Sequence, residues 1–529
     1  MLAVVAVGIY FRLAHFDDQV YWHDEAYTSL RISGFTSAEI RQNLFDDRVV
    51  SAADVLRYQH PGVGKTVFDV VHSLAAEDAQ HPPLCYLMAW TWVKAFGASV
   101  GTLRSLSALI GLFVLPGLYW LCQELFNQPP FSSKSIPSTL GSAGVFTGLA
   151  LALAAVSPYH LLYAQEAREF GLWTVLILFY SAAFLRALRL NTWVAWGLTA
   201  GFLAAGLYTL PLMLLVALAN TVYLLIAERF RLNQKVRRGL LSLAGAILAY
   251  GPWLWVLYQS RAPGTSWTAQ PIPISLLFKV WGMHVARAFY IPPGDFGFDH
   301  WSTYLMLPLL LLLVAYSFYK LGRSAPLRVW LFVLLLAASV ALPLVAADLI
   351  LGGQRSTSSR YLVPFYLGLL LAVAYLLAYL LSAERVPSRR GARDWQRCLG
   401  LGLTALVLGL GIASCGFNAR AETAWTKVIS YSLPEVARVI NAAPKPLLVS
   451  DAFGINLGSV LALSHRLEPQ VRLLLIGSSD VQHVPQIPQE YETVFVFNPS
   501  EHFRQLLEQQ ERQKLSLRFN DVHLFLWQL

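Results

Sequence analysis

The chain has 529 residues, of which 56% are hydrophobic and only 13% are charged, and its mean hydropathy is +0.50. Soluble domains carry about 25% charged residues, so this composition excludes an ordinary soluble enzyme. The net charge of +9 would suggest a nucleic-acid partner for a soluble protein. Here the basic residues cluster in short loops between apolar segments, so they are interpreted as topology signals and no nucleic acid is expected.

The first apolar segment, residues 2–14, is short for a membrane span, because a helix of this length reaches only about 20 Å. It is either a thin first span or the end of a longer one that starts before Met1. No small-residue cleavage pattern follows it, so no cleavable signal peptide is predicted. The four cysteines show no CxxC spacing, so neither a disulfide framework nor a metal knuckle is expected.

Apolar segments along the chain predict a polytopic α-helical membrane protein with about eleven spans. The predicted spans are residues 2–14, 105–126, 140–156, 170–188, 193–210, 211–227, 240–258, 304–319, 329–349, 361–381 and 398–415. A further apolar stretch, residues 84–96, is short enough to be interfacial or re-entrant. If it does not cross, all four strongly basic clusters fall on one side, which the positive-inside rule places in the cytoplasm.

The opposite, extracytoplasmic side then holds the loop 15–104, the turn 157–169, the loop 259–301, the tip 350–360 and the tail. In the tail, strand-like runs alternate with helix-like ones. The strand-like runs are residues 447–450, 471–476, 493–497 and 522–529, and the helix-like ones are 454–464 and 501–513. This pattern predicts a small α/β domain in residues 417–529, of unknown role, after a transmembrane module in residues 1–416.

Two adjacent carboxylates, Asp24 and Glu25, lie in the first outer loop just after the first apolar segment. One interpretation is an ordinary solvated loop in which Asp24 caps the following helix. The other is a cleft in which the carboxylates do chemistry. Other polar residues on the same side of the membrane favour the second interpretation.

Ionisable residues at helix ends near a membrane are costly unless they are paired or solvated, so they are functional candidates. Glu166 and Arg168 follow a predicted span, with a solvated loop and a local ion pair as the alternative. His284 and Arg287, three residues apart, share a helix face and could grip a phosphate. Arg360 and Tyr361 enter another span, where interfacial anchoring is the alternative.

Taken in order, these motifs resemble the GT-C glycosyltransferases, which use polyprenyl-phosphate sugars. The nearest kin are the protein O-mannosyltransferases, the aminoarabinose transferases of lipid A and related lipopolysaccharide sugar transferases. The resemblance covers residues 1 to about 380 and leaves the tail uncovered. The motifs that carry it are Asp24-Glu25-Ala26, His81-Pro82-Pro83-Leu84, Phe96-Gly97 with Arg104, Ser157-Pro158 with Gln165-Glu166-Ala167-Arg168, and Arg360-Tyr361-Leu362 with Pro364.

The resemblance implies that Asp24 is the catalytic base and that Glu166 is a second acid near the reacting centre. The substrate-binding residues would be Glu25, His81, Arg168, His284, Arg287, Arg360 and Tyr361. His81 stands where the aminoarabinose transferases have a lysine that contacts the lipid phosphate. His284 matches a metal-binding histidine of those enzymes and is the only metal candidate. The sequence offers no full ligand set beside it, so a divalent metal is left open.

The chemistry agrees with this assignment, because sugar transfer needs a base for the acceptor proton and a cation for the departing phosphate. The resemblance therefore implies a hexosyl- or pentosyltransferase of the cell envelope, integral to the plasma (inner) membrane, with an outward-facing site. Its donor would be a polyprenyl-phosphate sugar, and its acceptor a lipid, a glycan or a protein hydroxyl. The rival interpretations are a transporter or lipid flippase and a non-catalytic scaffold.

Overall fold

The computed structural model describes the chain except residues 63, 127–139, 261–265, 293–299, 383–389 and 478–483. The chain divides into two compact units. The helical unit comprises Met1–Phe16, Gln80–Leu84 and Ser107–Arg420, and the mixed unit comprises Asp17–Ala79, Cys85–Leu106 and Ala421–Leu529. The sequence analysis placed the first outer loop in the transmembrane module; the structure groups most of it with the tail.

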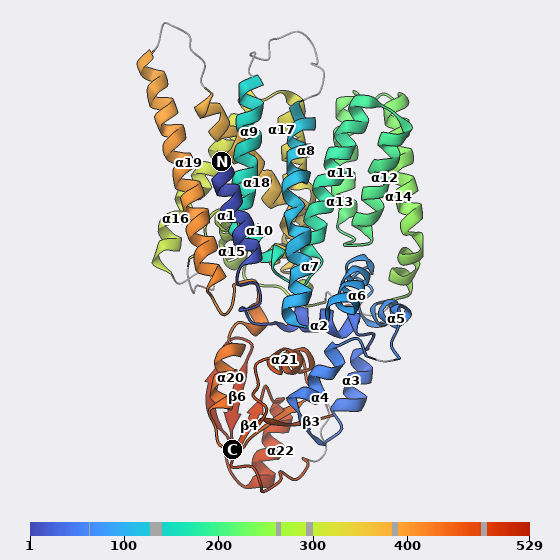
Figure 1. Cartoon of the computed structure of the whole chain (residues 1–529), viewed down its shortest axis with the longest axis vertical. Helices are drawn as coiled ribbons and strands as arrows, with labels where there is room; N and C mark the ends of the chain where they lie inside the picture. Colours follow the sequence, from blue (N-terminus) through green and yellow to red (C-terminus); the bar gives the residue numbers. More distant parts are fainter. Residues whose placement is uncertain (63, 127–139, 261–265, 293–299, 383–389, 478–483) are drawn as a thin grey trace. The chain divides into compact units, whose positions relative to one another are not determined.

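Long apolar helices build the helical unit, where many of them run side by side (Figure 1). They are α1 (Leu2–Leu13), α8 (Val114–Phe126), α9 (Leu140–Ala155), α10 (Pro158–Ala164), α11 (Phe170–Leu190), α12 (Trp193–Leu207), α13 (Met213–Ala227), α14 (Gln234–Gln259), α15 (Ile274–Arg287), α16 (Trp301–Ser324), α17 (Leu327–Leu351), α18 (Val363–Leu381) and α19 (Arg390–Ala419). The unit boundary falls within α7 (Val100–Leu112). Three 3₁₀ turns, η2 (Ser266–Ala269), η3 (Arg355–Thr357) and η4 (Ser359–Leu362), lie in the connections.

Each of the eleven predicted spans coincides with a helix in the described residues. Seven of these helices are long and apolar enough to cross a membrane, or eight if the bent pair α9 and α10 counts as one span. The other three, α1, α12 and α13, are apolar but shorter. The chain is therefore a multi-pass helical membrane protein.

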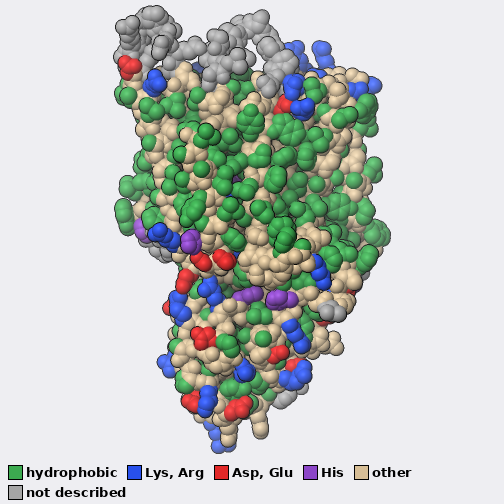
Figure 2. All heavy atoms as spheres, viewed as in Figure 1, with side chains coloured by type: hydrophobic (Ala, Val, Ile, Leu, Met, Phe, Trp, Pro, Cys, Tyr) green, Lys and Arg blue, Asp and Glu red, His purple; other side chains and the backbone are tan. Residues whose placement is uncertain are grey.

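The surface of the helical unit fits a bilayer. Hydrophobic side chains form a broad band around its helices, and Lys and Arg side chains gather toward the helix ends (Figure 2). Helices α14 and α16 place much of their apolar surface outward. In each helix, only 22% of the apolar 18-residue stretch that could cross a membrane is buried inside the protein. An apolar exterior of this kind is stable only against lipid.

Arg12 is a charged residue within the first apolar helix, α1. Its side chain is buried and donates hydrogen bonds to the backbone oxygens of Ala155 at 2.6 Å and Ala154 at 2.9 Å. These carbonyls end α9 and have no partners in their own helix, because Ser157-Pro158 breaks the helix and α10 leaves at 58°. Arg12 therefore caps α9 at the break.

The mixed unit contains a six-stranded sheet in the order β1-β3-β2-β4-β6-β5. Strands β2 (Pro446–Asp451), β3 (Arg472–Ile476) and β4 (Thr493–Phe497) are parallel, and β1 (Val49–Ser51), β6 (Phe525–Gln528) and β5 (Ser516–Asn520) are antiparallel to their neighbours. The tail also forms α20 (Leu433–Asn441), α21 (Asn456–Leu463), α22 (Glu501–Glu511) and the turn η5 (Val428–Ser430). The first outer loop forms α2 (His23–Ile32), α3 (Ser37–Leu44), α4 (Ala52–Leu56), the turn η1 (Arg57–Gln59), α5 (Val67–Glu77) and α6 (Leu84–Phe96).

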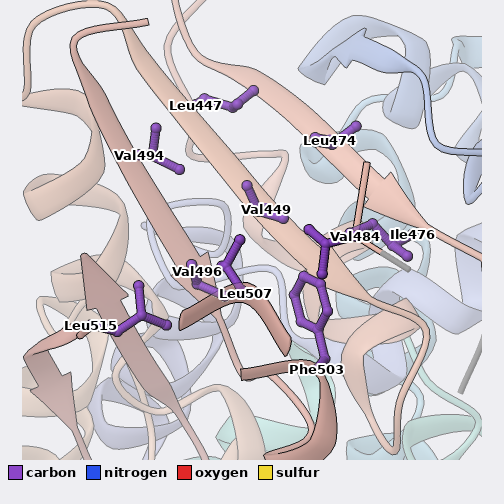
Figure 3. Packing of buried hydrophobic residues seen from close by; sticks show 10 residues of the cluster. All are labelled: Leu447, Val449, Leu474, Ile476, Val484, Val494, Val496, Phe503, Leu507 and Leu515. Carbon is purple, nitrogen blue, oxygen red and sulfur yellow. The ribbon is translucent and has the colours of Figure 1, made fainter. Parts of the chain in front are cut away.

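The predicted α/β character of the tail is confirmed, and four of the strands match predicted runs. One face of the sheet packs on α22, with Val449, Val496, Phe503 and Leu507 in the common core (Figure 3). The sequence analysis did not predict β5, which is largely exposed, or β1, which comes from the first outer loop and pairs with β3. The tail sheet is therefore completed by a strand more than 390 residues earlier in the chain.

Close packing of α17 and α18 predicts a strong effect for Gly368→Ala. A methyl group at Gly368 would lie 2.5 Å from the Cβ of Ala337, whereas one at Gly409 of α19 meets nothing within 4 Å. We expect Gly368→Ala to destabilise the protein by about 1–3 kcal/mol through overpacking. Gly409→Ala should be neutral or stabilise by up to about 1 kcal/mol. Thermal unfolding in detergent measures both, and equal melting temperatures for the two variants would contradict the packing.

Candidate active site

Asp24 and Glu25 lie in the first turn of α2, where carboxylates interact favourably with the helix dipole. Asp24 is half-buried, and its backbone oxygen accepts a hydrogen bond from Thr28 Oγ1 at 3.1 Å. The side chain that folds back on the helix start is Glu25, whose Oε2 accepts the Trp22 N–H at 3.4 Å. The alternative in which Asp24 caps the helix is therefore wrong: the N-cap is Trp22, Asp24 is the second residue of α2, and Glu25 at the third position accepts from the Trp22 backbone.

Glu25 is fully buried in a cluster of charges within the mixed unit. Arg104 donates to both of its carboxylate oxygens, at 2.7 Å and 2.5 Å, and the ammonium of Lys427 lies 3.4 Å away. Arg104 also donates to the backbone oxygens of Gln19 and Val20. Removing one partner of a buried pair leaves an uncompensated charge, so these contacts hold the start of α2 in place. Substrate binding by Glu25 itself stays a prediction.

In the helical unit, His81, Arg168 and Glu169 form a second cluster. Glu169 is buried, and its Oε1 lies 2.9 Å from His81 Nδ1 and 3.3 Å from Arg168 Nη2. Burial opposes ionisation, but the nearby Arg168 and His81 outweigh it and lower the pKa of Glu169 to about 2. Glu169 therefore stays ionised at neutral pH and orients the Arg168 guanidinium and the His81 imidazole.

The segment 157–169 is buried throughout, so the alternative of a solvated loop is wrong. It forms α10 and a short bend instead. Glu166 is only 2% exposed, and the preceding Gln165 donates to the backbone oxygens of Phe11 and Ala14. The burial of Glu166, Arg168 and Glu169 follows from their place between α10 and the deeply buried helix α11. Arg168 and Glu169 are paired inside the protein, which is more typical of a functional site than of a loop.

His284 and Arg287 are both buried in the last turn of α15, as their spacing predicts. His284 Nδ1 lies 3.1 Å from the hydroxyl of Tyr366. Burial and the charge of Arg287 lower the pKa of His284 to about 3, so the imidazole is neutral at physiological pH. The phosphate grip expected of this pair can thus draw its positive charge only from Arg287. Within the described residues, no group of three or more His, Cys, Asp or Glu side chains could hold a metal.

Arg360 and Tyr361 lie in η4, at the entry to α18. The Arg360 guanidinium lies 5.6 Å from the ring centre of Trp267 and 6.0 Å from that of Phe170, so aromatic faces surround it. The loop before it is tied to Asp348, a buried acid of α17. Asp348 accepts the Arg355 N–H at 2.9 Å and both the N–H and hydroxyl of Ser356 at 2.7 Å.

The structure sorts the nine predicted site residues by unit. Asp24 and Glu25 belong to the mixed unit, and the other seven belong to the helical unit. Within the helical unit, His81 and Arg168 meet at Glu169. The hydroxyls of Tyr159 and Tyr163 contact the backbone oxygen and side chain of Ser359, which brings α10 next to the turn that carries Arg360 and Tyr361.

Sequence reasoning missed several residues that position these groups. Glu169 was not among the predicted site residues, and Asp348 and Tyr366 lie within predicted apolar spans. A signal existed for Asp348, because an acid near the end of an apolar span needs a partner. No signal pointed to Lys427, whose partner lies 402 residues away.

No family model matches the chain, and no curated protein matches it by sequence. By structure it is similar to ArnT from Cupriavidus metallidurans, both bound to undecaprenyl phosphate (TM-score 0.52) and in the apo state (TM-score 0.53). Each comparison covers 100% of this chain and 97% of that one at 14% identity. An oligosaccharyltransferase from Archaeoglobus fulgidus is less similar, with a TM-score of 0.46 and 10% identity over 90% of this chain and 64% of its own.

The likeness to ArnT spans the whole chain, including the tail that the sequence motifs did not cover. At 14% identity it concerns the fold alone. The resemblance to the GT-C glycosyltransferases, with the aminoarabinose transferases among the nearest kin, is confirmed at that level. The chain therefore shares the fold of ArnT, as the motif resemblance predicts.

The lowered pKa of His284 predicts a pH dependence of stability. An unfolded histidine titrates near pH 6.5, about three units above folded His284. Below that pH the unfolded state binds a proton that the folded state does not, so stability falls as pH falls. The loss is up to about 1.4 kcal/mol per pH unit. The melting temperature of the wild type should therefore fall further between pH 7 and pH 5 than that of His284→Gln. His72→Gln, at an exposed histidine, is the control, and parallel slopes for wild type and His284→Gln would contradict the assignment.

Proposed function

We propose that this protein is a membrane glycosyltransferase that moves a sugar from a polyprenyl-phosphate donor to an extracytoplasmic acceptor. The observation that carries the proposal is the anchored acid of the mixed unit. Asp24 is half-buried in the first turn of α2, and the neighbouring Glu25 is fixed by Arg104 and Lys427. A carboxylate on a helix turn held in this way is preorganised to take a proton from an acceptor hydroxyl.

The proposed donor site draws on the cations of the helical unit. The departing polyprenyl phosphate needs positive charge, which Arg168, Arg287 and Arg360 supply, whereas His284 is neutral. Arg287 is buried at the end of α15 and Arg360 is ringed by aromatic groups, so both act in surroundings of low dielectric. Glu166 is the second acid of the proposal, and His81 supports Arg168 through their shared contact with Glu169.

A lipid-linked donor accounts for the membrane fold. The polyprenyl chain dissolves in the bilayer, and only the phosphosugar head has to enter a polar site. One of the structurally similar ArnT crystals contains undecaprenyl phosphate, which supports a donor of this class. The basic loops between the spans support an outward-facing site in the plasma membrane, because the positive-inside rule leaves Asp24 on the opposite side from them.

A specific observation also supports a second candidate, a lipid flippase or transporter. Helices α9 and α10 form a span broken by 58°, and the ionisable cluster around Glu169 follows it. Broken helices beside buried charges are typical of transporters. The two candidates differ in their dependence on Asp24, since movement of a lipid requires no base for a hydroxyl proton.

The decisive test is Asp24→Asn, assayed for transfer of radiolabelled sugar from polyprenyl-phosphate donors to membrane lipids, glycans and peptides in liposomes. The amide keeps the shape of the carboxylate but cannot take the proton, so we expect kcat to fall by about 10²–10⁴-fold with donor binding retained. Asp17→Asn is the matched control, because Asp17 is exposed on the same loop. Equal transfer by wild type and Asp24→Asn would reject Asp24 as the base. Lipid movement without any sugar transfer would favour the flippase.

Glu166→Gln tests the proposed second acid independently of the proposed base, Asp24. If Glu166 acts near the reacting centre, the variant should lose about 10-fold or more in kcat while its melting temperature stays close to that of wild type. A large fall in melting temperature with unchanged kcat in the folded fraction would assign Glu166 to structure instead. Both quantities can be measured on the liposome preparations used for Asp24→Asn.

A further inference from the structure

The motif resemblance gave the C-terminal tail no role, and the contacts inside the mixed unit suggest one. We propose that the tail builds the catalytic loop, and that Lys427 of the tail is a positioning residue that holds the start of α2 and thereby Asp24. The inference rests on the proposed function for the role of Asp24. Its structural half, that the tail fixes residues 19–26, stands on contacts alone.

Lys427 reaches the start of α2 through its ammonium group. The side chain is only 3% exposed, and its Nζ donates to the backbone oxygen of Val20 at 2.7 Å and lies 3.4 Å from Glu25 Oε2. Arg104 Nη2 donates to the same two groups, at 2.8 Å and 2.5 Å. The carbonyl of Val20 and the carboxylate of Glu25 are therefore held between two cations, one of them from the tail.

Backbone contacts continue this connection on the N-terminal side of Asp24. The His23 N–H, at the first position of α2, donates to Ser430 Oγ at 3.1 Å. The Val20 N–H donates to the backbone oxygen of Glu422 at 2.7 Å. Hydrogen bonds from residues 20 and 23 and the ion pair of residue 25 thus all end on the segment 422–430. Because residues 20, 23 and 25 are all bound to the tail, the backbone around Asp24 has little conformational freedom.

Helix α21 of the tail packs directly on α2, and a glycine makes this possible. A side chain at Gly458 would clash with the rings of His23 and Tyr27. The Tyr21 ring stacks edge-on against His465, with ring centres 4.7 Å apart. The residues on either side of Asp24 are therefore in contact with the tail through packing as well as through charge.

These contacts predict a specific kinetic defect for Lys427→Gln. Loss of the ammonium frees Val20 and Glu25 from one of their two cations, and a small displacement of a catalytic group lowers the rate steeply. We expect kcat to fall by about 10- to 100-fold, because a misplacement of about 1 Å costs up to 10²-fold. KM for the donor lipid should change less than about threefold, because the proposed donor-binding cations lie in the helical unit.

The experiment compares three lysine variants of the full-length protein in liposomes. Lys427→Arg keeps the positive charge and should retain most of the kcat that Lys427→Gln loses. Lys445→Gln is the matched control, since Lys445 is also a tail lysine in an ion pair, with Glu492 at 2.7 Å, but is 68% exposed. Ser430→Ala removes only the hydroxyl that accepts from His23 and serves as a milder second variant if Lys427→Gln does not fold.

Hydrogen–deuterium exchange of the peptide that contains residues 19–26 tests the positioning half without relying on activity. Exchange there should rise in Lys427→Gln and Ser430→Ala and stay at the wild-type level in Lys445→Gln. Unchanged exchange would overturn the inference, as would a loss of kcat in Lys427→Gln without increased exchange. If the wild type transfers no sugar, the proposed function fails, and increased exchange in Lys427→Gln would still support the fixing of α2 by the tail.

Discussion

The buried carboxylate of Glu25 is the constraint on which the mixed unit depends. A charge with no exposure to water must be compensated inside the protein, and its partners are 79 and 402 residues away in the sequence. Arg104 lies near the start of the candidate membrane span Val100–Phe126, and Lys427 comes from the tail. The ion cluster therefore forms only when the first outer loop, the start of a span and the tail have all reached their places. An acid beside the proposed base acquires its environment from three parts of the chain.

The helical unit solves a related problem at the break between α9 and α10. Ser157-Pro158 interrupts the helix, and the exposed carbonyls at the end of α9 would be costly inside an apolar bundle. Arg12 donates to these carbonyls, so a charged residue in an apolar helix satisfies a broken backbone. The break then lets the following residues turn into the interior, where Glu169 gathers Arg168 and His81. Pro158, which breaks the helix, Arg12, which caps it, and Glu169, which binds Arg168 and His81, thus position polar side chains among apolar helices.

The sequence predicted those parts of the fold that follow from local pattern. Each of the eleven apolar runs predicted as spans coincides with a helix in the described residues, and alternation of strand-like and helix-like runs located most of the tail. It could not predict β1, a three-residue strand whose partner β3 lies in the tail, because nothing local specifies that pairing. The candidate acids and arginines were found for the same reason, since charges stand out near apolar segments. The buried partner of Glu25 was not: Lys427 becomes informative only through the carboxylate that the fold brings to it.

In the helical unit, neutral His284 belongs to a network of hydrogen bonds and stacked aromatic rings. Because its imidazole is uncharged at neutral pH, His284 cannot neutralise a phosphate, but its Nδ1 lies within hydrogen-bonding distance of Tyr366. Tyr366 in turn stacks on Tyr159, with ring centres 3.5 Å apart, and Tyr159 donates to the backbone oxygen of Ser359, next to Arg360. This network connects helix α15, which carries Arg287, to the turn η4, which carries Arg360, and its histidine is neutral. It thereby contributes to the placing of the two arginines that the proposed function assigns to the lipid phosphate.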